Sequence, residues 1–446
     1  MENSPEIIAE RIALAEKAQV KFVDLQFTDV VGVVKNVTIP SHELGQSLIK
    51  GIYFDGSAIE GFARVAENDM HLRPDANTFA ILPWLKGEDA TARLICDVYT
   101  PDGQPFQGDP RAILRRAISE AKEMGFRYNT GPELEFFLLK PNSNGSLIPP
   151  LPHDSANYFD APSDLAAGLR RQMASTLDAF GIHVEAMHHE GAPGQQEIDF
   201  RYSDALTTAD SAVTLRVALK IIAQQNGLYC TFLPKPIRGI NGSGMHIHQS
   251  LAFLSSGKNA FADSGDPHGL SRIAKHFIAG QLAHARGMCA ILAPLVNSYK
   301  RLVAGYEAPV SISWARINRS ALIRVPRATS SETTRIELRN PDPSCNPYLA
   351  FAVMLQAGLD GIRRELQIPD AADENIFSPM AQPKNGLAIL PGSLNQALNA
   401  MEQDDVVRQA LGVLTFDRFL SAKRLEWDDY RLDISEWELT KYLPNY

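Results

Sequence analysis

The sequence predicts a mixed α and β protein of two domains, and three observations support this class. The chain has 446 residues, of which 45% are hydrophobic, so it can bury a large core and divide into two or more domains. The turn-rich stretch TPDGQPFQGDP, residues 100–110, predicts a boundary. In the larger part that follows, short strand patterns alternate with helical patterns. We therefore expect one domain over residues 1–104 and another over residues 105–446.

The N-terminal part begins with an amphipathic segment that predicts a helix over about Pro5–Lys17. Apolar residues alternate with polar ones in VKFVDLQFTDV, residues 20–30, and TFAILPWL, residues 78–85, which predicts strands. Between them, residues 51–70, GIYFDGSAIEGFARVAENDM, are expected to form a loop punctuated by glycines.

Beyond the boundary, DPRAILRRAISEAKEMG, residues 109–125, predicts a helix with Asp109 as its cap and a proline in its first turn. The longest apolar region, residues 276–296, is interrupted by His284 and Arg286. Because two polar side chains interrupt it, we do not expect this region to span a membrane.

The charge balance bears on partners and location. Asp and Glu number 52 against 43 Lys and Arg, a formal net charge of -9, which argues against a nucleic-acid binder. The N-terminus lacks a basic stretch followed by an apolar core, so no secretory signal is expected. We predict a cytoplasmic protein that binds neither nucleic acid nor membrane.

The four cysteines lie far apart and form no CxxC pair, so neither a disulfide framework nor a thiolate zinc site is indicated. We expect buried free thiols at Cys96, Cys230, Cys289 and Cys345. A metal ion would then be bound through oxygen and imidazole.

Three segments carry acidic residues or histidines in suggestive patterns. In GPELEFFLL, strand alternation places Glu133 and Glu135 on one face, where like charges repel unless a cation lies between them. A solvated strand face is the alternative. HHEGAPGQQEIDF supplies Glu190 and Glu197, and HIH supplies His246 and His248 on one strand face, although a histidine pair alone is more often structural.

The segment TTRIELRNPDP places Arg335, Glu337 and Arg339 on one strand face, so that two guanidinium groups flank a carboxylate. A surface ladder of ion pairs is the alternative. Three further arginines in nearby segments indicate an anionic substrate: Arg301, Arg319 and Arg324. Glutamates with histidine, and no paired thiolates, favour Mg²⁺ or Mn²⁺. The chain has no GxxxxGK[ST] and no GxGxxG loop.

Taken together and in this order, eight segments resemble a type I glutamine synthetase of the shorter subtype that is not adenylylated. They are FDGSAIEGF, GPELEFFLL, HHEGAPGQQEIDF, PKPIRGINGSGMHIHQS, NSYKRLVAGYEAPV, NRSALIRVP, RIELRNPDPSCNPYLA and EWDDYRLDISEWELTKYLP. The resemblance implies an α+β fold with a small N-terminal β-grasp-like domain. It implies a large C-terminal catalytic domain with a curved antiparallel sheet flanked by helices.

The activity that the resemblance implies is an ATP-dependent ligation of ammonia to glutamate through a γ-glutamyl phosphate. One divalent ion would be held by Glu135, Glu190 and Glu197, and a second by Glu133, His246 and Glu337. Charge on the phosphoryl group would be stabilised by Arg319, Arg335 and Arg339. Nucleotide contacts match Tyr202, His248 and Ser250. Substrate contacts match Asn241, Gly242, Arg301 and Arg324.

The resemblance also assigns the nitrogen donor and the assembly. Asp55 matches the carboxylate that binds ammonium, with Tyr158 and Glu190 as its partners. Glu307 matches a flap over the intermediate, and Arg64 an arginine of glutamine feedback. The resemblance implies a ring assembly, typically two stacked hexamers, whose sites lie between subunits.

Two other functions stay open from the sequence. A γ-glutamyl ligase that uses a polyamine or another primary amine is the first, and Asp55 argues against it because an ammonium site would obstruct a bulky amine. A catalytically inactive relative is the second, and the complete set of metal-ligand candidates argues against that. Ala58, Gly191, Gln196 and Arg238 depart from the usual family residues, and Phe377 stands where adenylylated relatives carry tyrosine.

Overall fold

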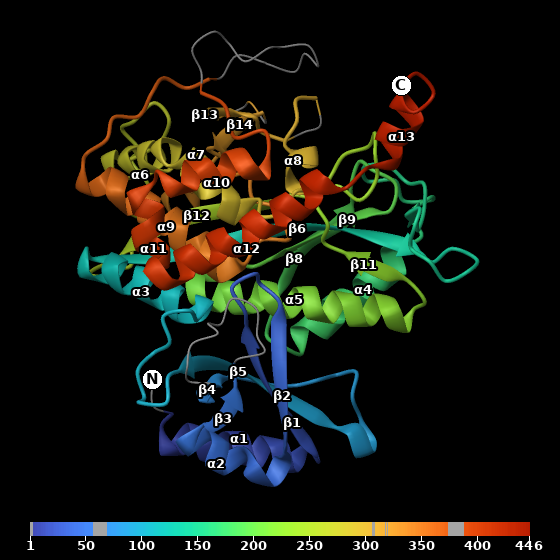
Figure 1. Ribbon diagram of the computed structural model, residues 1–446. Coiled ribbons are helices and arrows are strands. Elements are labelled where there is room, and N and C mark those ends of the chain that lie inside the picture. Colours follow the sequence, from blue (N-terminus) through green and yellow to red (C-terminus); the bar gives the residue numbers. More distant parts are fainter. Residues whose placement is uncertain (1–2, 57–68, 306–307, 317, 319, 373–387) are drawn as a thin grey trace.

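The structure is a computed structural model that describes residues 3–56, 69–305, 308–316, 318, 320–372 and 388–446. In these residues the chain forms a small N-terminal unit around one β-sheet and a larger unit around a second sheet (Figure 1). The larger unit carries most of the helices, which pack around its sheet (Figure 1).

The N-terminal sheet has five described strands in the order β2-β1-β5-β4-β3. Its strands are β1 Phe22–Thr28, β2 Val34–Pro40, β3 Ile52–Asp55, β4 Asp69–Ile81 and β5 Thr91–Tyr99. The β1 and β5 strands run parallel, and the other neighbours run antiparallel. Apolar side chains of the sheet pack with the helices α1 Pro5–Lys17 and α2 Leu44–Lys50 in one hydrophobic cluster.

The larger sheet follows the order β13-β14-β15-β12-β6-β9-β8, and three short strands also pair with β6. Its strands are β6 Phe126–Lys140, β7 Leu151–Pro152, β8 Val184–His189, β9 Gln195–Phe200, β10 Ser203–Asp204, β11 Tyr229–Thr231, β12 Met245–Phe253, β13 Ser311–Ala315, β14 Ala321–Arg324 and β15 Ile336–Leu338. Only β13 and β14 run parallel among the described pairs of this sheet. The expected curved antiparallel sheet is therefore a mixed one.

Most helices of the larger unit pack around this sheet and bury one of its faces, whereas the last helix does not. The helices of this unit are α3 Pro110–Glu123, α4 Ala167–Asp178, α5 Ala205–Gln225, α6 Arg272–Ala283, α7 Ala285–Leu292, α8 Ser298–Arg301, α9 Pro347–Arg363, α10 Leu394–Glu402, α11 Asp405–Leu411, α12 Val413–Leu432 and α13 Glu436–Tyr442. Leu134, Phe136 and Leu138 of β6 are fully buried in the same core as α5 and α9. Because strand side chains alternate between faces, Glu133 and Glu135 lie on the opposite face.

The apolar region 276–296 is two helices broken at His284, which ends α6 and precedes α7. The imidazole Nε2 of His284 lies 3.0 Å from Asp360 Oδ2, and its Nδ1 lies 2.9 Å from Asp404 Oδ2. None of the helices in the described part of the chain combines the length and apolar character that crossing a bilayer requires.

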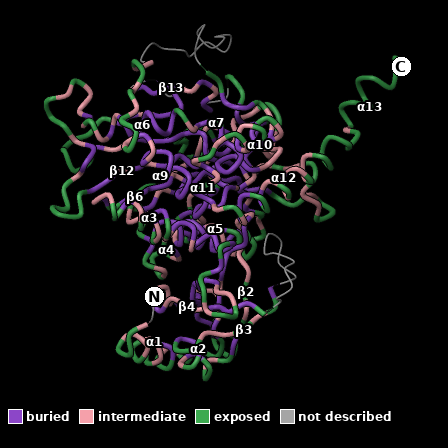
Figure 2. Tube along the Cα trace, turned by 60° about the vertical axis from the view of Figure 1, so that its left-hand side comes forward, coloured by how far each residue is buried: buried purple, intermediate pink, exposed green. Residues whose placement is uncertain are grey.

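The C-terminal helix α13 extends away from the body of the subunit (Figures 1 and 2). It buries none of its own residues. Large apolar side chains are exposed along it and directly after it, including Trp437 at 52% and Leu443 at 71%. This end of the chain therefore presents an apolar surface that its own fold does not cover.

Several elements expected from the sequence are confirmed. The helix α1 has the expected bounds and α3 lies within the expected residues 109–125, where Asp109 caps it by accepting from the Arg111 backbone N–H at 3.0 Å. All four cysteines are free and buried. The loop expected over residues 51–70 is wrong at both of its ends, because Ile52–Asp55 pairs with β4 as strand β3 and β4 begins at Asp69. Residues 57–68 lie outside the described chain.

A buried ionic cluster joins the two units. Arg111 of α3, with a side chain only 3% exposed, donates to Asp210 of α5 at 2.8 and 3.0 Å. It also donates to Asp97 at 2.6 Å and Asp75 at 2.9 Å, both in the N-terminal sheet. Tyr348 of α9 donates to Asp210 at 2.7 Å. One guanidinium group thus binds carboxylates from both units.

Replacing Arg111 by methionine should therefore destabilise the whole chain, because three carboxylates would lose their buried cation. Removing one partner of a buried pair typically costs about 3–5 kcal/mol, and the free energy of unfolding in urea measures it. Arg364→Met is the matched control, since Arg364 is 58% exposed in its pair with Asp360. Its effect should stay below about 1 kcal/mol. Equal effects of the two variants would contradict a linking role for Arg111.

Candidate active site

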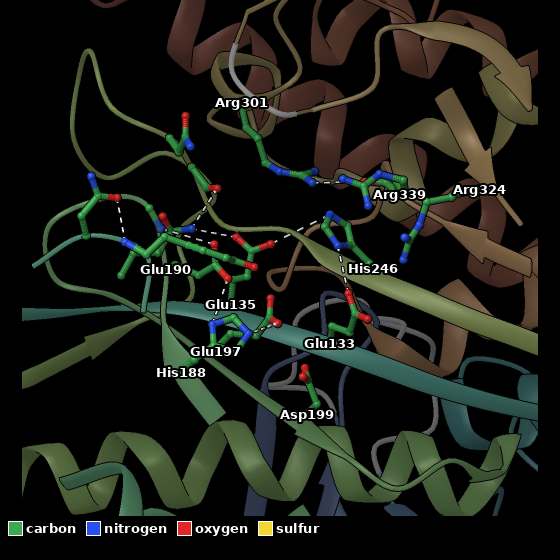
Figure 3. Close-up of a pocket in the computed structure, with 16 residues that line it drawn as sticks. Glu133, Glu135, His188, Glu190, Glu197, Asp199, His246, Arg301, Arg324 and Arg339 are labelled. Atoms are coloured by element: carbon green, nitrogen blue, oxygen red, sulfur yellow. Dashed lines mark hydrogen bonds and ion pairs between the residues drawn. The ribbon is translucent and has the colours of Figure 1, made fainter. Parts of the chain in front are cut away.

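A cavity of about 600 Å³ opens on the polar face of the larger sheet (Figure 3). Acidic, basic and amide side chains line most of it. The lining residues are Glu133, Glu135, Asn157, Tyr158, His188, Glu190, Gly191, Gln195, Glu197, Asp199, Asn241, Gly242, His246, Arg301, Arg324 and Arg339. Eleven of these residues are ones that the sequence singled out: Glu133, Glu135, Tyr158, Glu190, Glu197, Asn241, Gly242, His246, Arg301, Arg324 and Arg339.

The strand register explains why these side chains meet. Glu135 of β6 lies opposite Glu197 of β9, which in turn lies opposite His188 of β8. Directly opposed residues of neighbouring strands project from the same face. The next row pairs His246 with Glu133, and Glu133 with Asp199. A third row pairs His248 with Glu337, and Glu337 with Arg324.

In the part of the cavity around Glu190 and Glu197, the carboxylates outnumber the positive groups of the protein. Burial and the nearby carboxylates Glu135 and Glu197 raise the pKa of Glu190 to about 9. Burial and the charge of Asp199 raise the pKa of Glu197 to about 11. Asp199 has its own pKa raised to about 7 by burial and by the charge of Glu133. A bound cation would relieve this repulsion.

Glu133 has the opposite environment because two histidines contact it. His246 Nδ1 lies 3.2 Å from Glu133 Oε2, and His248 Nε2 lies 2.6 Å from Glu133 Oε1. Burial raises the pKa of Glu133, but the hydrogen bonds from these histidines outweigh burial and hold it well below its usual range. His246 Nδ1 also lies 3.7 Å from Glu337 Oε1.

Glu337 is fully buried between two arginines, but they are not the pair that strand alternation suggested. Arg339 Nη1 donates to Glu337 Oε1 at 2.6 Å, and Arg324 Nε donates to Glu337 Oε2. Arg335 instead donates to His248 Nδ1 at 3.3 Å. The expected Arg335 contact is wrong because β14 lies beside β15 and brings Arg324 opposite Glu337.

The glycines of GINGSGMHIH allow this loop to pass close to its neighbours. A Cβ atom on Gly242 would lie 2.2 Å from the Pro234 carbonyl oxygen, and one on Gly244 would lie 2.5 Å from Arg301 Nη2. Arg301 is itself 2% exposed and donates to the carbonyl oxygens of Arg339, Asn340 and Pro341. The loop therefore needs glycine for its own packing beside the cavity.

Gln195 ties this loop to the acidic residues. Its amide nitrogen donates to Glu135 Oε2 at 2.7 Å and to the Gly242 carbonyl oxygen at 3.2 Å. The Gly244 backbone N–H donates to the same Glu135 oxygen at 3.0 Å. Glu135 is thus held by two donors and is fixed in orientation.

Among the described residues, two groups of side chains could each hold a metal ion, because one ligand atom of each member lies within 4.8 Å of the others. The first is Glu133, His248 and Glu337, and the second is His188, Glu197 and Asp199. The first differs from its expected set only in the histidine, whereas the second shares only Glu197 with the expected Glu135, Glu190 and Glu197. Oxygen and imidazole donors in these groups fit Mg²⁺ or Mn²⁺.

Other expected residues lie away from the cavity or outside the described chain. Tyr202 is 60% exposed, and Ser250 lies further along β12 than the histidines. Asp55 ends β3 in the N-terminal sheet and does not line the cavity. Arg64, Glu307 and Arg319 lie outside the described residues, as do Ala58 and Phe377.

Sequence reasoning missed four residues of the cavity: Asn157, His188, Gln195 and Asp199. Asp199 follows Glu197 at the same two-residue spacing that singled out Glu133 and Glu135, so the signal was present. His188 stands two residues before Glu190 in the quoted segment. Of the four departures from the family pattern, Gly191 lines the cavity, whereas Gln196 is fully buried and accepts from Arg170.

Comparison with known proteins agrees with this geometry over nearly the whole chain. Residues 19–101 match the family model described as glutamine synthetase, beta-Grasp domain, and residues 107–442 match glutamine synthetase, catalytic domain. The chain is 53% identical to a glutamine synthetase of Thermus thermophilus over 98% of its length and 99% of the relative's. It is 51% identical to one of Clostridium saccharobutylicum over 98% of both chains.

A solved structure named "GmaS/ADP complex-Conformation 1" matches 100% of both chains with a TM-score of 0.89 at 31% identity. The fold, the two family models and the whole-length relatives therefore agree with one another. This chain belongs to the glutamine synthetase family.

Proposed function

We propose that the cavity ligates ammonia to the γ-carboxylate of L-glutamate at the expense of ATP. The γ-carboxylate is first phosphorylated to γ-glutamyl phosphate, and ammonia then displaces phosphate to give L-glutamine, ADP and phosphate. The observation that carries this proposal is the division of one cavity into an acidic part around Glu197 and a basic part around Arg339. A polyamine-using γ-glutamyl ligase is not favoured, because the whole-length relatives are glutamine synthetases.

We propose that two or more divalent ions, Mg²⁺ or Mn²⁺, bind in the cavity. Glu135, Glu190 and Glu197 would hold one, and Glu133, His246 and Glu337 would hold the other. The raised pKa values of Glu190 and Glu197 support the first set, since they mark carboxylates without enough positive charge. When bound, such ions neutralise charge on the ATP phosphates.

The chain's own side chains would then position the reactants. Arg301 and Arg324 are proposed to bind substrate carboxylate or phosphate, with Asn241 and Gly242 beside the glutamate. Arg319, Arg335 and Arg339 are proposed to stabilise charge on the phosphoryl group. Nucleotide contacts are proposed for Tyr202, His248 and Ser250. The roles of Glu307 as a flap and Arg64 in feedback rest on the resemblance.

The nitrogen donor and the assembly are linked in this proposal. Asp55, with Tyr158 and Glu190, is proposed to bind ammonium, yet Asp55 lies in the N-terminal sheet and does not line the cavity of its own chain. This placement supports a ring in which the N-terminal domain, residues 1–104, completes the site in the catalytic domain, residues 105–446, of a neighbour. We propose two stacked hexamers in the cytoplasm, and the exposed apolar side chains of α13 support assembly.

Asp55→Ala should lower the rate of glutamine formation by roughly 10² to 10³-fold, the usual effect of losing a preorganised electrostatic partner. Phosphorylation of glutamate should fall less, because it does not need the amine. The assay compares phosphate release with ammonia, methylamine, ethanolamine and a polyamine as donors. A parent protein that turns over a larger amine much faster than ammonia would overturn the proposed donor.

Glu337→Gln should remove one divalent ion while keeping the shape of a fully buried side chain. The measurement is Mn²⁺ stoichiometry on the purified protein, with Glu332→Gln as the control, because Glu332 is exposed nearby. Loss of one ion in the first variant and none in the second is expected. Unchanged stoichiometry in both would remove Glu337 from the metal site.

Stability without metal should depend on pH, and bound metal should offset that dependence. The pKa of Glu190 is about 9 in the folded metal-free chain against an ordinary 4.5, so the folded state binds more protons than the unfolded state between these values. Stability without metal should therefore fall as pH rises from about 5 to 9. Mg²⁺ should raise the melting temperature more at pH 9 than at pH 6, because it binds ionised carboxylates.

Melting curves in EDTA and in Mg²⁺ across this pH range test the prediction. Glu190→Gln is the control, since the neutral amide removes one titrating group and should reduce the difference between the two curves. A metal effect that is independent of pH would show that these carboxylates do not bind the ion.

A further inference from the structure

A fully buried ion pair lies directly behind Glu190. His189 Nε2 lies 2.9 Å from Asp154 Oδ1, and both side chains are 0% exposed. The other ring nitrogen, Nδ1, lies 2.6 Å from the carbonyl oxygen of Glu190. Neither His189 nor Asp154 lines the cavity.

The two ring nitrogens of the imidazole have different partners. A carbonyl oxygen can only accept, so Nδ1 donates to Glu190, which leaves Nε2 to pair with the Asp154 carboxyl group. His189 therefore links the Asp154 carboxyl group to the main chain of Glu190 through its two ring nitrogens. Burying two charges costs desolvation free energy, and a well-packed apolar pair is often at least as stable. A contribution to the stability of the fold therefore does not by itself explain why His189 and Asp154 occupy these positions.

The pair holds both ends of the bend that carries Glu190. The Gly194 backbone N–H donates to the same Asp154 oxygen at 3.0 Å, so Asp154 binds residue 189 at the start of the bend and residue 194 at its end. Gly194 has φ +73°, and a Cβ atom there would lie 2.8 Å from the Leu138 carbonyl oxygen. Within the bend, the Glu190 backbone N–H donates to the Gln195 carbonyl oxygen at 2.9 Å.

We infer that Asp154 and His189 are positioning residues that fix the backbone of Glu190 so that its carboxylate stays in the acidic part of the cavity. The hydrogen bond from His189 reaches the main chain of Glu190 and not its carboxylate, which lies 3.3 Å from His188 Nδ1 in the cavity. This inference rests on the proposed role of Glu190 in metal and ammonium binding.

Asp154→Asn is the direct test because asparagine keeps the shape and an acceptor oxygen for the Gly194 N–H. The amide oxygen is a weaker acceptor than a carboxylate oxygen, so the link between residue 154 and His189 is weakened. Outer partners of this kind typically affect metal affinity or activity by about 10- to 100-fold. We expect a rise of that size in the KM for ammonium and in the Kd for Mn²⁺ measured by calorimetry, with the KM for ATP changed less than about twofold.

Asp360→Asn is the matched control, since Asp360 forms a similar pair with His284 between helices that do not line the cavity. It should lower the melting temperature while leaving the ammonium KM and the Mn²⁺ Kd unchanged. If Asp154→Asn does not fold, His189→Gln provides the same comparison. Equal changes of ammonium KM in the test and control variants, or none in either, would overturn the positioning role.

A double-mutant cycle separates this inference from the function on which it rests. If Asp154 acts through Glu190, combining Asp154→Asn with Glu190→Gln should raise the ammonium KM no more than Glu190→Gln alone. Additive effects would refute the coupling. If Glu190→Gln alone leaves the ammonium KM and Mn²⁺ Kd unchanged, the proposed role of Glu190 fails, whatever Asp154→Asn does.

Discussion

Repulsion between carboxylates on neighbouring strands is the constraint on which the cavity depends. Glu135 and Glu197 are opposite each other on β6 and β9, and Glu190 reaches the same space from the adjoining bend. Their surroundings are largely buried, so water cannot screen them fully, and the pKa values of Glu190 and Glu197 rise. Such an arrangement is costly for folding. A divalent ion bound between the carboxylates would offset this cost by supplying the missing positive charge.

The rest of the fold holds these carboxylates in place despite their repulsion. On the opposite sheet face, Leu134, Phe136 and Ile247 are completely buried, which fixes the register of β6 and β12. A slip of one residue would move every acidic side chain into that core. Around the cavity, Gln195 and the Gly244 N–H bind Glu135. Hydrophobic packing sets the strands, and local hydrogen bonds orient the carboxylates.

Sequence patterns predicted which side chains share a face of one strand better than which strands are neighbours in the sheet. Spacing alone placed Glu133 with Glu135, and His246 with His248, because side chains two residues apart share a face. It could not identify the neighbour of β15, and so it chose Arg335 over Arg324 as the partner of Glu337. Pairing of segments distant in sequence depends on the global topology. The short β3 was missed for a similar reason, since Ile52 becomes a strand residue by pairing with Leu72.

The two parts of the cavity differ in how their charge is balanced, and this difference bears on which charged group each part can bind. Glu337, beside the cavity, already pairs with Arg324 and Arg339, and His246 and His248 contact Glu133. Because positive groups already accompany these carboxylates, anionic phosphates can approach this part of the cavity without strong repulsion. The part around Glu190 and Glu197 instead attracts cations. A reaction that joins an anionic acyl phosphate to a nitrogen arriving as ammonium needs both environments within one cavity, and the strand order supplies them side by side.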